Sequence, residues 1–173
     1  MSGPERSTPA EHRATAPTSV GCFVLTVSDT RTPDDDTGGA VIRERLGAAG
    51  HVVVGSRIVR DEPADVTRLV RQACTDPHVQ VVILTGGTGI TSRDSTFEAV
   101  EALLDKRLPG FGELFRVLSW EQVGAAAMLS RAQMGIHARR IVVSLPGSPG
   151  ACRLALDKLL LPELGHLVRE VSR

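Results

Sequence analysis

Residues 79–94 of the chain read VQVVILTGGTGITSRD, an apolar run followed by three glycines in four positions. The apolar run is rich in Val and Ile, which is typical of a strand that is buried on both faces. Glycine costs conformational entropy to order. A turn this rich in glycine therefore serves either a tight geometry or the close approach of another group to the backbone.

The same order of strand, polar turn and helix recurs on both sides of this stretch. The sequence predicts strands at CFVLTVSD, HVVVGSRIV and RRIVVSLPG, and helices at AVIRERLGAAG, ADVTRLVRQAC and TFEAVEALLDKRL (residues 22–29, 51–59, 139–147, 40–50, 64–74 and 96–108). This alternation predicts an α/β fold with a doubly wound, mostly parallel sheet and helices on both faces.

The remaining segments complete the predicted organisation. Residues 109–131 favour a helix interrupted by glycines, and residues 148–171 predict one or two closing helices with Pro162 as a break. Residues 1–19 are polar and rich in Pro, Ser and Thr, which predicts a disordered tail. Residues 20–173 are expected to form a single domain.

Composition narrows the class of protein. The chain has 173 residues, of which 42% are hydrophobic, and its formal net charge is zero. A neutral chain argues against nucleic acid as a partner, because binding to the phosphate backbone needs a basic excess. No apolar run approaches the roughly 20 residues that span a bilayer. Three cysteines without paired spacing indicate reduced thiols and a cytoplasmic location.

Polar residues gather where the predicted strands end. In open α/β sheets ligands bind beyond the carboxyl ends of the strands. That rule selects the pair Ser28 and Asp29, the run 60–62, the glycine turn, and the run Pro146, Gly147 and Ser148.

The glycine turn (Gly86, Gly87, Thr88 and Gly89) has two readings of equal weight. It is either a cradle of backbone N–H groups for a phosphate at a helix start, or simply a tight turn. It matches no nucleotide-binding fingerprint.

The two charged residues that follow the turn add a second alternative. Arg93 would clamp a phosphate, and Asp94 would hold Mg²⁺ against it. Equally, Asp94 would cap the helix that begins next.

Two further acidic segments are interpreted either as solvated surface residues or as part of the ligand-binding site. Asp61 is a solvated turn residue, or it shares the ligand-binding rim with Asp94. The run DDDTGG (Asp34–Gly39) is predicted to be a solvated loop that closes over the site, with metal binding as a minor alternative.

Several segments together resemble one family. TVSDTR, VRDE, LTGGTGITSRDSTFEA, LPGFGELFRVLS, AAMLSRA and SLPGSPGA occur in the order found in molybdenum cofactor biosynthesis proteins of the MoaB/MogA type, to which the gephyrin G domain is similar. The resemblance covers roughly residues 20–171. Phe97 stands where the commoner motif has proline, whereas Thr96, Glu98 and Ala99 match.

The resemblance implies a three-layer α/β/α fold and a homo-oligomer, either a trimer or a hexamer. It also implies that ATP, Mg²⁺ and molybdopterin are bound, and that the terminal phosphate of molybdopterin is adenylated with release of pyrophosphate. The downstream molybdate-inserting enzyme is an implied partner. The alternative is a non-catalytic protein that binds or delivers molybdopterin.

The resemblance also assigns roles to particular residues. It places the catalytic aspartates at Asp61 and Asp94. It places the binding residues at the glycine turn, at Ser130 and at the loop Pro146–Ser148.

Overall fold

The computed structural model describes residues 16–173. Six strands form one sheet in the order β2-β1-β3-β6-β5-β4. The strands are β1 (Gly21–Val27), β2 (Val52–Val59), β3 (Val81–Thr85), β4 (Lys106–Arg107), β5 (Gln133–His137) and β6 (Arg140–Leu145). The β2-β1-β3-β6 part is parallel, whereas β5 and β4 are antiparallel to their neighbours. The predicted doubly wound, mostly parallel sheet is confirmed.

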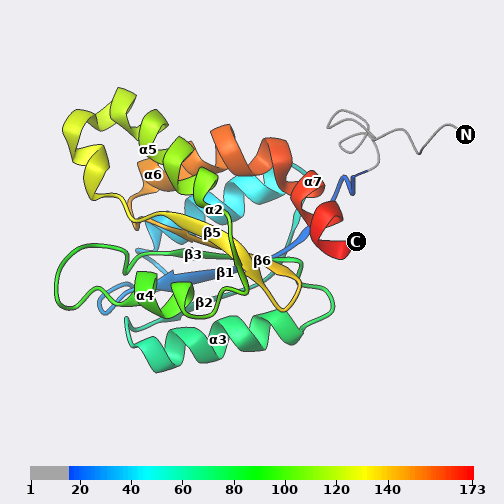
Figure 1. Ribbon diagram of the computed structural model, residues 1–173. Coiled ribbons are helices and arrows are strands. Elements are labelled where there is room, and N and C mark those ends of the chain that lie inside the picture. The colour runs from blue at the N-terminus through cyan, green and yellow to red at the C-terminus, as the bar shows by residue number, and fades with distance from the viewer. Residues whose placement is uncertain (1–15) are drawn as a thin grey trace, which may run out of the picture.

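Helices cover both faces of the sheet, which gives three layers (Figure 1). The helical elements are α2 (Thr37–Ala48), α3 (Pro63–Thr75), α4 (Thr96–Glu101), α5 (Pro109–Val123), the 3-10 turn η1 (Gly124–Leu129), α6 (Pro149–Ala155), the π-turn η2 (Leu156–Leu160) and α7 (Leu161–Ser172). Helices α2, α5, α6 and α7 pack on one face, and α3 and α4 pack on the other. None of the helices within residues 16–173 is long and apolar enough to cross a membrane.

The core is built by strands that are buried on both faces. All five residues of β3 are buried, and their side chains alternate between two apolar clusters. Ile83 belongs to the cluster under α2, whereas Leu84 belongs to the cluster under α3. An uninterrupted apolar run is what a strand with two covered faces requires.

The antiparallel edge corrects the sequence-based prediction. The segment 133–137 was not predicted as a strand, yet it forms a hairpin with β6 through Ala138 and Arg139, both at positive φ. Its sequence QMGIH alternates poorly and lacks a glycine-based turn signal. The helix predicted at 96–108 ends at Glu101, because Lys106 and Arg107 pair with β5 instead.

Pro162 does not break the closing helix. The π-turn η2 directly precedes it, and α6, η2 and α7 continue one another without a loop from Pro149 to Ser172. Proline lacks an N–H and clashes with the carbonyl one turn earlier. The wider π-turn is a known way to accommodate such a disturbance within a helix.

Only the last four residues of the predicted tail, 16–19, belong to the described part of the chain. Residues 1–15 lie outside it, whereas Ala16 and Pro17 are half-buried beside Gly165 of α7. A Cβ on Gly165 would lie 2.3 Å from the Pro17 carbonyl oxygen. The Ser19 hydroxyl donates a hydrogen bond to the Gly50 carbonyl at 2.9 Å. Residues 16–19 therefore contact the domain.

Candidate functional site

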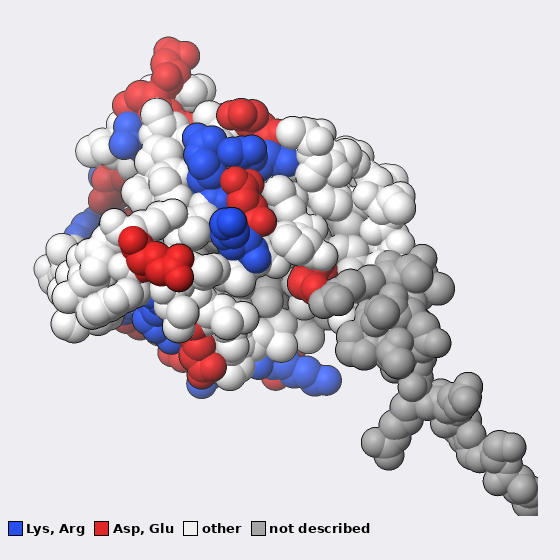
Figure 2. Space-filling view, turned by 90° about the horizontal axis from the view of Figure 1, so that it is seen from above, with Lys and Arg blue, Asp and Glu red and all other residues white. Residues whose placement is uncertain are grey.

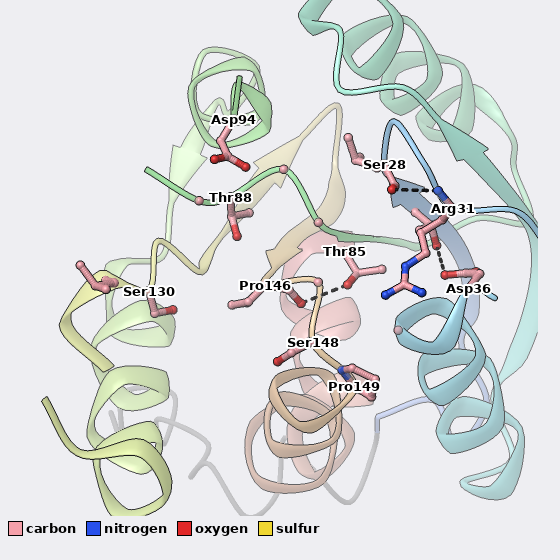
Figure 3. Close-up of a pocket in the computed structure, with 18 residues that line it drawn as sticks. Ser28, Arg31, Asp36, Thr85, Thr88, Asp94, Ser130, Pro146, Ser148 and Pro149 are labelled. Atoms are coloured by element: carbon pink, nitrogen blue, oxygen red, sulfur yellow. Dashed lines mark hydrogen bonds between the residues drawn. The ribbon is translucent and has the colours of Figure 1, made fainter. Parts of the chain in front are cut away.

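A cavity of about 580 Å³ opens beyond the carboxyl ends of β1, β3 and β6 (Figure 3). Its wall includes most of the sequence-predicted site residues: Ser28, Gly86, Gly87, Thr88, Gly89, Asp94, Ser130, Pro146, Gly147 and Ser148. These residues come from five separate segments of the chain. Of the places that the strand-end rule selected, Ser28, the glycine turn and the run 146–148 line the cavity, whereas Asp29 and the run 60–62 do not.

The glycine turn has the conformation that only glycine adopts readily. Gly86 and Gly87 have φ of 100° and 64°. A Cβ on Gly86 would lie 2.1 Å from the Val27 carbonyl oxygen, and one on Gly87 would lie 2.1 Å from the Thr96 hydroxyl oxygen. The turn is therefore tightly packed against neighbouring groups, and it also lines the cavity. The two readings of the sequence do not exclude each other.

Two helix starts face the same cavity. Gly38, in the first turn of α2, and Ser148 with Pro149, at the start of α6, all line it. The Ser148 hydroxyl accepts a hydrogen bond from the Ala151 N–H at 3.2 Å and so caps α6. Helix N-termini carry partial positive charge and free N–H groups. The cavity is therefore suited to a negatively charged ligand.

Asp94 lies in the cavity wall and does not cap α4. Its Oδ2 accepts hydrogen bonds from the Thr91 N–H at 3.0 Å and the Thr91 hydroxyl at 2.5 Å. The hydroxyl bond is the main reason why the pKa of Asp94 is lowered. The carboxylate is directed at the glycine turn (Figure 3), where a Cβ on Gly89 would lie 2.6 Å from it. A half-exposed, ionised carboxylate thus stands beside the turn.

Asp61 lies behind the glycine turn and does not line the cavity. It is only 5% exposed, so the solvated reading of this residue is wrong. Its Oδ1 accepts hydrogen bonds from the Ser95 N–H at 3.3 Å, the Ser95 hydroxyl at 2.8 Å and the Thr96 hydroxyl at 3.2 Å. Asp61 therefore fixes the start of α4, which is the capping role that the sequence had suggested for Asp94.

Arg93 and Asp29 bind each other away from the cavity. The Arg93 guanidinium donates from Nε to Asp29 Oδ2 at 2.7 Å and from Nη2 to Asp29 Oδ1 at 2.9 Å. It also donates to Glu62 Oε1 at 2.9 Å. The hydrogen bond from Arg93 lowers the pKa of Asp29 to about 2. The Arg93 guanidinium is thus bound to two carboxylates, whereas the sequence had suggested that it clamps a phosphate.

Two charged residues of the cavity wall, Asp36 and Arg31, were not predicted as site residues from the sequence. Asp36 was placed in a solvated loop, which is wrong, because it is 3% exposed and caps α2. Its Oδ1 accepts hydrogen bonds from the Thr26 hydroxyl and the Gly39 N–H, each at 3.0 Å. An Asp three residues before the Gly39 N–H is a capping signal that would have found it. Arg31 follows Ser28, whose hydroxyl accepts the Arg31 N–H at 3.1 Å.

Arg131 braces the glycine turn from outside. Its Nε donates to the Thr88 carbonyl at 3.0 Å, its Nη2 donates to the Gly89 carbonyl, and its Nη1 pairs with Glu98. Its guanidinium carbon lies 4.9 Å from the centre of the Phe97 ring. One side chain thus orients two peptide groups of the turn.

An α/β fold with such a cavity beyond its strand ends is typical of proteins that bind phosphate-bearing ligands. The family described as "Probable molybdopterin binding domain" matches residues 23–166, and the chain belongs to this family. Within it, the chain is similar to molybdenum cofactor biosynthesis protein B of Bacillus cereus. The two are 50% identical over 164 residues, which are 94% of this chain and 97% of that protein.

Solved structures agree with this assignment. A crystal structure of molybdenum cofactor biosynthesis protein B matches with a TM-score of 0.89 at 50% identity, covering 92% of this chain and 99% of that chain. The tungsten cofactor synthesizing protein MoaB from Pyrococcus furiosus matches with a TM-score of 0.80 at 39% identity, covering 91% of this chain and 100% of that chain. The resemblance inferred from the motifs is confirmed.

Proposed function

We propose that the protein adenylates the terminal phosphate of molybdopterin with Mg-ATP. One observation carries the proposal: an ionised carboxylate, Asp94, stands in a cavity that is also lined by the glycine turn and by the starts of α2 and α6. Molybdopterin is proposed as the second substrate because the chain belongs to the molybdopterin-binding family. A cavity that offers backbone N–H groups beside a carboxylate suits a phosphate paired with a divalent cation.

The reaction joins the two substrates directly. An oxygen of the molybdopterin phosphate attacks the α-phosphorus of ATP and forms a new P–O bond. The bond between the α-phosphorus and its bridging oxygen breaks, and pyrophosphate leaves with that oxygen. The glycine turn and the helix starts orient the phosphates and stabilise the charge that develops on them.

Of the two carboxylates in the cavity wall, Asp94 fits a magnesium ion better, because Asp36 is paired with Arg43. Within residues 16–173, no group of three or more His, Cys, Asp or Glu side chains is able to hold a metal ion. Magnesium usually takes one or two carboxylates and completes its shell with waters and substrate phosphates. Asp94 would thus hold the ion together with ATP, and the ion would neutralise phosphate charge.

Binding without turnover is the second candidate. It is favoured by the position of Asp61 and Arg93, which do not line the cavity. The two candidates separate in one experiment: purified protein is incubated with molybdopterin, ATP and Mg²⁺. Formation of adenylated pterin and pyrophosphate supports the enzyme. Tight binding of molybdopterin without either product supports the binding protein.

We also propose that the protein is a homo-oligomer. Leu114, Val117, Trp120 and Val123 of α5 follow one another at intervals of three, and each is more than half exposed. Phe111 and Phe115 of the same helix do not belong to this face, because they are core residues, 6% and 1% exposed. In Figure 2 a largely uncharged area covers the end of the molecule to which α5 and η1 project in Figure 1. Exposed apolar patches of this kind mark interfaces.

The Val117→Glu variant tests this face. A charge in the middle of a buried apolar contact is costly, so we expect light scattering to give a multiple of 18.4 kDa for the wild type and a much smaller mass for the variant. Val52→Glu is the matched control, because Val52 is 55% exposed but lies on β2. A wild-type mass of one chain at micromolar concentration would contradict the proposal.

A further inference from the structure

A second cavity, of about 780 Å³, lies between the loop after β1 and the edge strand β2. Four arginines line it against two aspartates: Arg31, Arg43, Arg57 and Arg60 against Asp29 and Asp36. It shares Ser28, Arg31 and Asp36 with the first cavity. The two cavities are therefore neighbours with a common wall.

Both aspartates of this cavity already have cationic partners. Asp36 Oδ2 accepts a hydrogen bond from Arg43 Nη1 at 3.0 Å, and its Oδ1 is bound by groups of β1 and α2. Asp29 is held by the fork of Arg93, which is not a lining residue. Arg43 and Arg93 are thus the nearest cationic partners of the two carboxylates.

Among the described residues, the other three lining arginines make only long ion pairs or hydrogen bonds to carbonyl groups. The Arg57 guanidinium donates to the Ser56 carbonyl at 3.0 Å, and the Arg31 guanidinium donates to the Asp35 carbonyl at 2.9 Å. A carbonyl oxygen accepts a hydrogen bond without cancelling a unit charge. Arg31 comes only within 3.9 Å of the Asp35 carboxylate, and Arg60 within 3.7 Å of Asp29. The cavity thus keeps an excess of positive charge.

Arg31 stands at the boundary between the two cavities. In Figure 3 its guanidinium points into the first cavity, between Thr85 and Asp36. Its main chain is fixed by the Ser28 hydroxyl, at the end of β1. A ligand held at the glycine turn therefore meets Arg31 on the side that leads toward Arg57 and Arg60.

We infer that the cavity of Arg31, Arg57 and Arg60 binds a diphosphate group. Several guanidinium groups around one concave surface match the multiple charged oxygens of a diphosphate, and such charge-assisted hydrogen bonds are strong. The inference rests on the proposed function, in which a diphosphate is present both within ATP and as the leaving group. The second cavity would receive that part of the substrate, while the first holds the reacting phosphate.

Calorimetric titration with inorganic pyrophosphate tests the inference, and a methylene-bridged ATP analogue forms a second arm. We expect the double variant Arg57→Gln/Arg60→Gln to bind pyrophosphate at least about tenfold more weakly than the wild type, the scale of losing charge-assisted hydrogen bonds. Wild-type affinity should also fall as salt is raised, because exposed charges are screened. Arg68→Gln is the control, since Arg68 is exposed on α3 and pairs with Asp65.

The two arms identify the source of the diphosphate. Weakening of both ligands supports binding of the ATP tail, and weakening of pyrophosphate alone supports a site for the leaving group. Unchanged affinity for both ligands in a folded double variant would overturn the inference and leave the arginines as protection for an edge strand. Failure of the proposed function appears separately, as absence of adenylated pterin from a wild type that still binds pyrophosphate through these arginines.

Discussion

The Asp94→Asn variant is expected to adenylate molybdopterin at least about a hundredfold more slowly than the wild type, on the scale of losing one electrostatic contact to the transition state. Asparagine keeps the size of the side chain and an oxygen that accepts the Thr91 N–H, but it removes the charge that a divalent cation needs. Stability should change by less than about 1 kcal/mol, as for other substitutions near a surface. The measurement is single-turnover formation of adenylated pterin.

The loop around Asp94 offers a purely structural explanation that the same variant tests. If the carboxylate serves only to close the loop 91–94 through Thr91, asparagine would replace it with little loss in either rate or stability. Asp65→Asn is the matched control, because Asp65 is a half-exposed aspartate on α3 away from the cavity. An Asp94→Asn protein with a rate close to that of the wild type would remove Asp94 from the mechanism.

The Gly86→Ala variant is expected to lose about 2–4 kcal/mol of unfolding free energy, from strain and steric overlap. Gly86 has φ of 100°, and a Cβ there would lie 2.1 Å from the Val27 carbonyl oxygen. That oxygen belongs to the backbone of β1, a strand in the middle of the sheet, and it has little freedom to move away. Urea unfolding measures the loss, and pterin binding should weaken with it because the turn lines the cavity.

Gly47→Ala is the control for this variant. Gly47 lies in α2, and no other group lies within 4 Å of the position that its Cβ would take. Alanine in a helix interior is favoured over glycine by roughly 0.5–1 kcal/mol. Gly47 lies in the last turn of α2, so this variant should be as stable as the wild type or slightly more stable. Equal behaviour of the two variants would show that the turn adapts to a side chain.

The sequence predicted well those features that depend on local pattern. The β-branched runs predicted the four parallel strands, and in β1, β3 and β6 the continuous apolar residues are those of a strand covered on both faces. The strand-end rule then located Ser28, the glycine turn and the loop at Ser148 around one cavity. Each of these features follows from residues that are adjacent in the chain.

Features that depend on distant partners were predicted less well. Strand β5 is held by its pairing with β6 and β4, and its own residues carry no strand pattern. Asp61 occurs in a polar run, but it is bound by Ser95, which lies 34 residues later and beyond α3 and β3. The local sequence around Arg93 gives no indication that this residue binds Asp29, which lies 64 residues earlier. These partners are set by the tertiary fold.

Leu129 belongs both to the cavity wall and to the exposed apolar surface beside α5, and this position has a thermodynamic consequence. It ends η1 immediately before Ser130, which also lines the cavity. If subunits associate through the α5 face, a neighbouring subunit and a ligand in the cavity would both order the segment of η1 and Ser130. Both events would then shift the same equilibrium between the ordered and less ordered forms of that segment. Linkage then requires each event to favour the other by an equal factor. Ligand affinity would rise with protein concentration, and added ligand would drive assembly.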